Sequence, residues 1–172
     1  MAFGPRVLEL QQALNSYGET SVRNYRLLHK FGDEVVYGLA AYLGEGARVH
    51  GVPPEGEWRP EAGDYHDAKF STYHRGIIVI EPILMGVGLR IPHSKDSGGF
   101  WMRVVVEMEL AREVIAVQIH DGKGVGGISI DYTTQDVERV QEAIFECARE
   151  VLTNPVRSVR GANRIGFIDE NT

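Results

Sequence analysis

The sequence predicts an α+β fold with N-terminal helices, an antiparallel meander sheet of five or more strands, and a long C-terminal helix packed on the sheet. Apolar residues follow helical spacing over residues 1–43, alternate strictly over 100–110, and form a helical stripe again over 134–153. The chain has 172 residues, of which 43% are hydrophobic and 24% are charged, and this is ordinary for one soluble globular domain. We therefore expect residues 1–172 to form a single domain.

Residues 1–43 are expected to be helical, in three pieces. Pro5 suits a first helical position, and apolar residues then recur at helical spacing up to Gly18. A second helix is expected after Thr20 and is punctuated at Gly32, and a third ends at Gly44, because glycine favours helix ends. The apolar positions of these pieces are Val7, Leu10, Leu14, Tyr17, Val22, Tyr25, Leu28, Phe31, Val35, Val36, Leu39 and Leu43.

Residues 44–67 form a loop rich in glycine and proline. Its glycines and prolines exclude any long regular element: Gly44, Gly46, Gly51, Gly56, Gly63, Pro53, Pro54 and Pro60. A loop of this length inside a compact domain is more often functional than merely connecting.

Residues 68–132 are expected to supply the antiparallel strands, over 69–73, 76–81, 83–91, 100–110, 114–121 and 128–132. Directly opposed residues of an antiparallel pair lie on the same face, so parity limits the register of the best-patterned pair. This predicts that Met108 faces Val117 and that Glu107 faces Gln118. The glycine-rich residues 122–127 are expected to be the next loop, which would place His120 near Ser129.

Residues 134–153 form the last helix and residues 154–172 a tail. Thr134 can cap the helix, and Asn154-Pro155 ends it. An apolar group at 165–168, which includes Phe167, must pack on its own domain or dock on a neighbour, and docking would imply a homo-oligomer.

Charge and cysteine content narrow the function classes. A net charge of −6 argues against a dedicated nucleic-acid binder or a protein that binds anionic membranes. The single cysteine, Cys147, excludes an intrachain disulfide, and the N-terminus lacks the pattern of a secretory signal, so we expect a cytoplasmic protein. No sequence motif for a cofactor is found, and none is expected to bind.

One candidate metal site lies in and after the long loop. Asp64, His66 and His74 carry ligand types that bind zinc and other divalent metals. None of the standard ligand spacings is present, so a solvated polar loop is the competing interpretation.

A polar sheet face is the main candidate for partner binding. A large aromatic side chain beside charged residues is typical of interface anchors. The candidate residues are Trp101, Arg103, Glu107, Gln118 and His120, together with Phe167 of the tail. In the competing interpretation the N-terminal helices cover this face and Trp101 belongs to the core.

The order of strands followed by a long C-terminal helix resembles the helix-grip architecture of proteins that bind lipids and other hydrophobic ligands. It also resembles small acidic secretion chaperones, in which helices flank a curved sheet. The leading hypothesis is a non-enzymatic protein-interaction module, adaptor-like or chaperone-like, that binds a protein partner or itself. The alternatives are a hydrophobic-ligand carrier with a cavity between helix and sheet, and a metal-dependent hydrolase that uses Asp64, His66 and His74.

Overall fold

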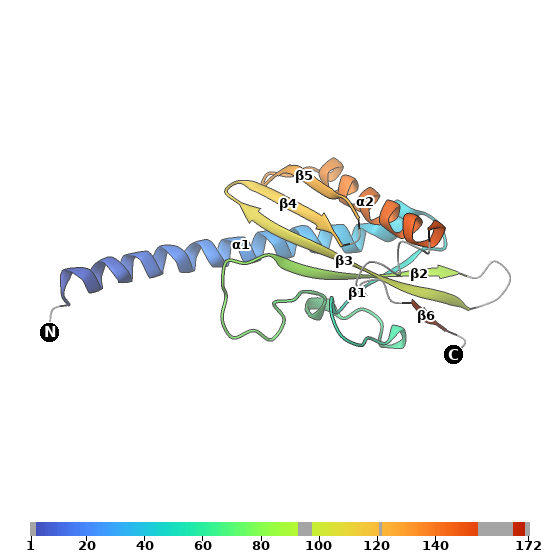
Figure 1. Ribbon diagram of the computed structural model, residues 1–172, viewed down its shortest axis with the longest axis horizontal. Helices are drawn as coiled ribbons and strands as arrows, with labels where there is room; N and C mark the ends of the chain where they lie inside the picture. The colour runs from blue at the N-terminus through green and yellow to red at the C-terminus, as the bar shows by residue number, and fades with distance from the viewer. Residues whose placement is uncertain (1–2, 93–97, 121, 155–166, 171–172) are drawn as a thin grey trace.

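The computed structural model describes residues 3–92, 98–120, 122–154 and 167–170 (Figure 1). Two helices, α1 (Pro5–Leu43) and α2 (Thr134–Thr153), accompany an antiparallel sheet, and the fold class is α+β as the sequence predicts. The strands are β1 (Arg48–Val52), β2 (Ile83–Pro92), β3 (Gly99–Ala111), β4 (Val114–Ile119), β5 (Gly124–Ser129) and β6 (Phe167–Asp169). Two short 3₁₀ helices, η1 (Pro60–Ala62) and η2 (His66–Lys69), lie in the long loop.

The sheet is a meander in the order β1-β2-β3-β4-β5, with β6 paired to β3. The long strand β3 pairs with β6 through residues 100–102 and with β4 through residues 106–111. Met108 pairs with Val117 and Glu107 with Gln118, which confirms the register predicted from parity. Ala111 and Val114 pair as well, so the connection is a tight turn at Arg112-Glu113.

Both helices pack on one face of this sheet. α1 lies against β1, β2 and β3, whereas α2 lies against β3, β4 and β5, and the two helices also contact each other. A continuous core of α1, sheet and α2 side chains includes Phe31, Met85 and Ile144, all of them fully buried. The apolar stripe of α2 therefore covers the sheet as predicted, and the helix has the predicted bounds, 134–153. Its N-cap is Thr133, which forms a capping box with Asp136, rather than Thr134.

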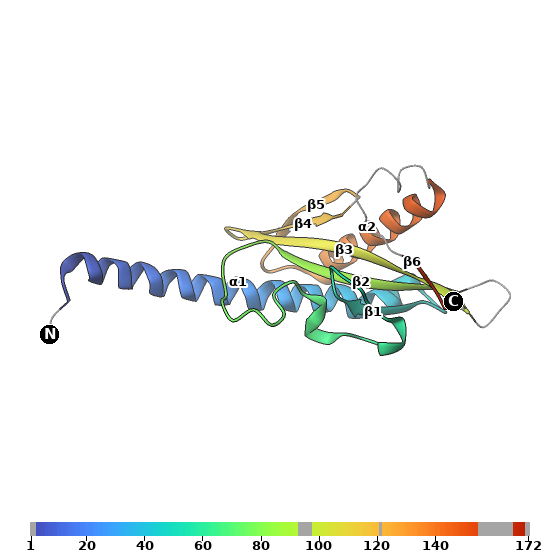
Figure 2. The ribbon, with the colours of Figure 1, turned by 60° about the horizontal axis from the view of Figure 1, so that its bottom comes forward.

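The N-terminal region is one continuous helix of 39 residues, so the prediction of three helices is wrong. Gly18 is tolerated inside the helix, and Gly32 has a packing reason. A Cβ atom at Gly32 would lie 2.8 Å from both the Met85 sulfur and the Phe70 ring, so the glycine lets the helix approach the sheet closely. Figure 1 and Figure 2 both show the first half of α1 projecting beyond the sheet.

The two short strands expected at 69–73 and 76–81 are not formed. Among the described residues, an isolated bridge between Phe70 and Met85 is the β-pairing of this stretch with β2, and the Leu84 N–H also donates to the Ser71 hydroxyl at 2.9 Å. Residues 73–80 are exposed. Sequence reasoning took their β-branched residues for strand positions, but no neighbouring strand lies beside them among the described residues.

The glycine-rich residues after β4 belong to a strand rather than to a loop. Gly124–Ser129 is β5, and a bulge between Ile115 and Val117 shifts its register so that Ser129 pairs with Val114. Ser129 therefore lies at the far end of β4 from His120, and the predicted juxtaposition of these residues is wrong. Neither α1 nor α2 contains an apolar stretch of the length that a membrane crossing needs.

Candidate interaction surface and polar network

Trp101 is buried by its own chain, with 3% of its surface exposed. It packs in a cluster with Val52 and Trp58, and the Trp58 ring meets it edge-on at 6.0 Å between ring centroids. Its indole N–H donates to the Glu170 carboxylate at 2.7 Å. The side chain therefore holds the long loop and the C-terminal strand on the outer sheet face, and the α1 helix is not what covers it.

Arg103 lies beside Trp101 on the same face and binds the long loop. Its Nη1 donates to the carbonyl oxygens of Pro53 at 3.1 Å and Gly56 at 2.7 Å. Burial lowers the pKa of the guanidinium, and the nearby Glu55 carboxylate partly offsets this effect. The contacts give Arg103 a role in fixing the loop to the sheet.

The other predicted residues of this face form local contacts across β3 and β4. His120 Nε2 lies 3.3 Å from the Glu107 carboxylate, and the Gln118 amide donates to the Ile119 and Gly122 carbonyls. Phe167 pairs through its backbone with Met102 in β6. The structure thus places all six predicted residues on or beside β3, and the partner-binding role of this face stays a prediction.

The three predicted metal ligands, Asp64, His66 and His74, do not come together at one site. Asp64 and His66 are joined at 2.9 Å, whereas His74 lies with its ring 3.8 Å from that of Tyr73. Within residues 3–92, 98–120, 122–154 and 167–170, no three His, Cys, Asp or Glu side chains are grouped so that they could hold a metal ion.

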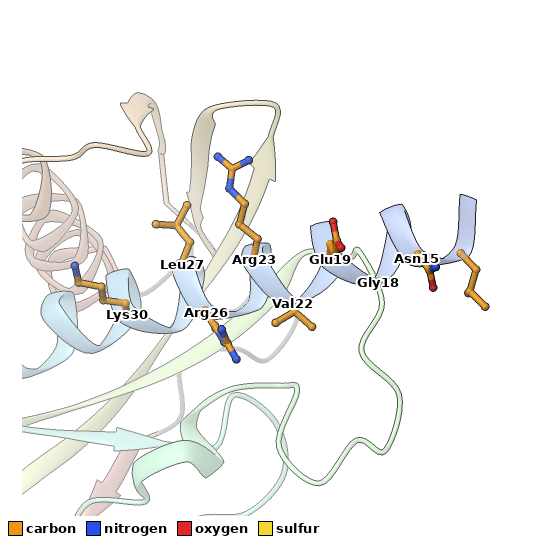
Figure 3. A pocket seen from close by; sticks show the side chains of 9 residues that line it. Asn15, Gly18, Glu19, Val22, Arg23, Arg26, Leu27 and Lys30 are labelled. Atoms are coloured by element: carbon orange, nitrogen blue, oxygen red, sulfur yellow. The ribbon is translucent and has the colours of Figure 1, made fainter. Parts of the chain in front are cut away.

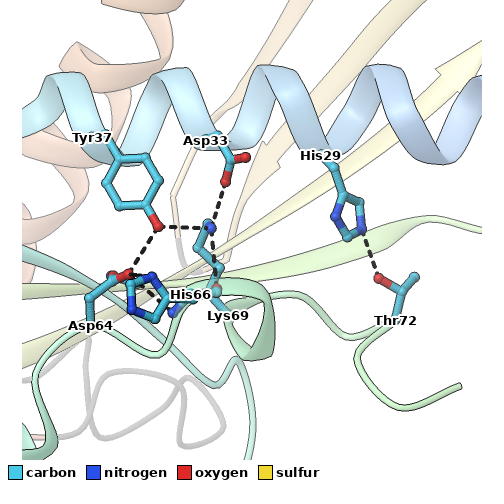
Figure 4. A network of polar contacts seen from close by, with 8 residues as sticks. His29, Asp33, Tyr37, Asp64, His66, Lys69 and Thr72 are labelled. Carbon is cyan, nitrogen blue, oxygen red and sulfur yellow. Dashed lines mark hydrogen bonds and ion pairs between the residues drawn. The ribbon is translucent and has the colours of Figure 1, made fainter.

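Asp64 instead belongs to a polar network between α1 and the loop, shown in Figure 4. Its carboxylate accepts hydrogen bonds from the Gly51 N–H at 2.5 Å, the Tyr37 hydroxyl at 2.9 Å and the His66 N–H at 3.1 Å. Burial alone would raise the pKa of Asp64, but these donors stabilise the charged form and lower the pKa overall.

Lys69 is the cation of this network, and it is only 1% exposed. Its Nζ lies 2.6 Å from Asp33 and donates to the Tyr37 hydroxyl at 3.3 Å and the His66 carbonyl at 3.2 Å. Nothing in the sequence pattern marks a buried lysine, so Lys69 and Tyr37 escaped prediction. A buried charge is tolerated when it is paired and hydrogen-bonded. This network ties η2 to the C-terminal half of α1.

An apolar stripe runs along the projecting half of α1. It consists of Val7, Leu10, Leu14 and Tyr17, which are 43–70% exposed. Residues spaced three and four apart share one helix face. The same spacing continues through Ser21, Asn24, Leu28, Phe31 and Val35, and the last three of these are buried in the core. The stripe is therefore the uncovered continuation of the face by which α1 packs on the sheet.

Residues 77–80 form a second exposed apolar group. Ile77 is 75% exposed, and Ile78, Val79 and Ile80 are each more than 40% exposed. The Ile80 N–H donates to the Tyr17 hydroxyl at 3.0 Å, which places this segment beside the end of the apolar stripe. A groove of about 160 Å³ between α1 and residues 72–83 continues the same surface. The stripe and residues 77–80 are together called the interaction surface below.

A second side of α1, which meets the stripe at Leu14, carries an open depression of about 960 Å³, shown in Figure 3. It is lined by α1 alone: Leu14, Asn15, Gly18, Glu19, Val22, Arg23, Arg26, Leu27 and Lys30. The figure shows Arg23 and Arg26 pointing in opposite directions across the helix. Their guanidinium groups do not converge, so the depression lacks the arrangement that would clamp an anion.

Comparisons with known proteins give no relative. No family model, no curated protein and no solved structure matches the chain.

Proposed function

We propose that this chain is a protein-interaction module and that it binds its partner through the interaction surface. The observation that carries the proposal is the exposed apolar stripe, in which Leu10 is 70% and Leu14 is 68% exposed on a helix that is otherwise built into the core. Contiguous exposed apolar patches on soluble proteins mark sites of association. Residues 77–80 widen the patch at its C-terminal end.

The stability of the projecting helix supports the same conclusion. Residues 5–20 are all exposed, and they include Asn15, Ser16, Gly18 and Thr20, whose helix propensities are low. Helices of about 12–15 residues without tertiary contacts are marginal in water, and most helical stability in proteins comes from packing of an apolar face. A partner on the stripe supplies that packing, at about 1.5–3 kcal/mol for each large side chain fully buried.

The burial of the core gives less support to the alternative that the chain carries a hydrophobic ligand. The α2 side chains that face the sheet, where such a carrier has its cavity, are at most 9% exposed and belong to one continuous core with the sheet. These are Val137, Val140, Ile144, Cys147, Ala148 and Val151.

Site-specific photocrosslinking tests the proposal in the cells that produce the protein. The photoreactive amino acid p-benzoylphenylalanine is placed at position 10, within the stripe, or at position 12 as the matched control. Position 12 lies about 200° round the helix from position 10. We expect a discrete protein adduct from position 10 that is roughly tenfold stronger than from position 12 and is lost with Leu14→Glu. Equal yields from the two positions would overturn the proposed surface.

A further inference from the structure

We propose that a pocket on the outer face of the sheet binds a free α-amino acid, whose carboxylate pairs with Arg48 and whose ammonium group pairs with Glu61. The pocket has a volume of about 560 Å³ and lies where β1, η1, β3 and β6 meet. It is lined by Arg48, His50, Pro60, Glu61, Trp101, Ile168 and Glu170. This pocket is separate from the interaction surface, because α1 packs on the opposite face of the sheet.

The size and lining of the pocket suit a small molecule. Ligand sites in proteins are typically clefts of about 300–1,000 Å³ that combine an apolar lining with a few polar groups. Pro60, Trp101 and Ile168 supply apolar surface here, beside charged side chains of both signs. The pocket therefore offers contacts both to the charged groups of a small molecule and to an apolar part.

The register of the sheet places two arginines side by side at this pocket. Arg48 of β1 is directly opposed to Arg90 of β2, and Arg90 is directly opposed to Trp101 of β3. Ile168 of β6 continues the row beside Trp101. Directly opposed residues lie on the same face, where like charges repel. Glu170 neutralises one of the two guanidinium groups, since its two carboxylate oxygens accept hydrogen bonds from Arg90.

Arg48 keeps its hydrogen-bonding capacity. Its side chain forms no hydrogen bond or ion pair with any described residue, and it acts on Glu170 through its charge alone, which helps to lower the pKa of that carboxyl. The guanidinium group is a planar fork that matches a carboxylate. A carboxylate supplied by a ligand would therefore bind Arg48 and relieve its repulsion with Arg90.

His50 and Glu61 also have unused hydrogen-bonding atoms. Within the described part of the chain, the Glu61 carboxylate accepts no hydrogen bond, and His50 Nδ1 is buried without a hydrogen-bond partner. Buried polar atoms in native proteins nearly always have such a partner, so this one calls for an explanation. A ligand in the pocket can supply it, directly or through a water molecule.

The balance of charge favours a zwitterion over a simple anion or cation. Two positive side chains, Arg48 and Arg90, and two negative ones, Glu61 and Glu170, lie at or beside the pocket. A ligand with a net charge would leave that charge uncompensated. A molecule with one carboxylate and one ammonium group uses both unpaired charges and leaves the apolar lining for its side chain. The α-amino acids have this chemistry.

Nuclear magnetic resonance of the purified full chain with L-phenylalanine tests the site. We expect the amide resonances of residues 48–50, 101 and 168–170 to shift, with a dissociation constant on the order of 1 mM or lower. Two analogues each lack one charge: 2-phenylethylamine has no carboxylate, and 3-phenylpropanoate has no ammonium group. Each should bind at least roughly tenfold more weakly than L-phenylalanine, because one charged hydrogen-bonding contact is lost.

Substitutions assign the two ends of the ligand. Arg48→Gln should weaken L-phenylalanine at least roughly tenfold without weakening 2-phenylethylamine, and Glu61→Gln should do so without weakening 3-phenylpropanoate. The matched controls, Arg112→Gln and Glu109→Gln, make the same charge changes at the other end of β3 and should leave binding unchanged. The dispersion of the amide resonances reports whether each variant is folded.

Three results would overturn this assignment. One is the absence of a shift at these amides with either L-phenylalanine or L-leucine at about 10 mM. Another is an analogue with a single charge that binds as tightly as L-phenylalanine. The third is unchanged binding of L-phenylalanine to folded Arg48→Gln. None of them affects the interaction surface, which is tested by crosslinking at position 10, and a failed crosslink leaves the pocket standing.

Discussion

At the scale of single residues, Glu170 gathers three contacts that close the outer face of the sheet. Its two carboxylate oxygens accept hydrogen bonds from Arg90 Nε at 2.7 Å and Arg90 Nη2 at 2.8 Å, and the Trp101 indole donates to one of them. The Arg90 guanidinium is the main cause that lowers the pKa of Glu170 to about 2, and the Trp101 hydrogen bond acts in the same direction. One side chain at the end of the described chain thus connects β2, β3 and the strand β6.

This arrangement predicts an acid-sensitive contribution to stability. Because the folded state lowers the pKa of Glu170 from 4.5, the stabilisation is complete above pH 4.5 and is lost as the pH falls toward about 2. Urea unfolding of the wild type and of Glu170→Gln should therefore give midpoints that differ at pH 7 and converge near pH 2. Glu109→Gln, at an exposed position of β3, is the control and should leave the midpoint unchanged. A gap that is independent of pH would contradict the assignment.

Residue-level chemistry was the part least open to prediction. Asp64 and His66 were selected by residue type and do meet, but as part of a structural network rather than with His74. Lys69 and Glu170 act through partners 36 and 80 residues away in the chain, Asp33 and Arg90. No local pattern encodes contacts of that range, because they depend on how distant elements pack.

At the scale of elements, the chain that leaves β1 crosses over β2 at Gly86. A Cβ atom there would lie 2.1 Å from the Val52 carbonyl oxygen and 2.8 Å from that of Pro53. Both are backbone atoms, so neither can move aside without displacing the crossing segment. The segment after β1 can therefore approach β2 this closely only because residue 86 is a glycine.

Gly86→Ala should consequently be strongly destabilising, by about 3 kcal/mol or more, since it forces overpacking against backbone. Gly126→Ala in β5 is the matched control, because a Cβ atom at Gly126 meets nothing within 4 Å. We expect that substitution to be neutral or to stabilise by about 0.5 kcal/mol, through reduced entropy of the unfolded chain. Thermal unfolding followed by circular dichroism compares the two, and equal effects would refute the steric explanation.

Helices and strands could be predicted from the sequence where neighbouring residues in the chain determine their structure. The β3–β4 register followed from parity because the two strands are joined by a tight turn. β5 was missed because its glycines carry no alternating side chains and a bulge shifts its pairing. α1 was divided at its glycines because propensity predicts ends there, whereas tertiary packing around Phe31 and Val35 keeps the helix continuous.

At the scale of the whole molecule, α1 belongs to two environments. Its second half is core, and its first half carries the same face into solvent. The order of the first half is then expected to depend on association, because its packing would come from the partner at the interaction surface.

The purified chain without its partner should therefore show reduced helix content. Fraying of residues 5–20 would remove up to about a quarter of the α-helical signal at 222 nm, given helices of 39 and 20 residues. Circular dichroism of the purified chain measures this, and a signal that accounts for both helices in full would contradict the dependence on a partner.

Residues 77–80 also affect the tendency of the protein to aggregate when no partner is bound. Three isoleucines and a valine in sequence have high β-propensity and no charge, and an exposed segment of this kind can template strand pairing between molecules. Glu81 and Pro82 follow directly, and a charge and a proline beside such a run act as gatekeepers against fibril growth. A partner bound at the interaction surface would shield the segment. Losing the partner would then expose it, and Glu81 and Pro82 would limit its self-assembly.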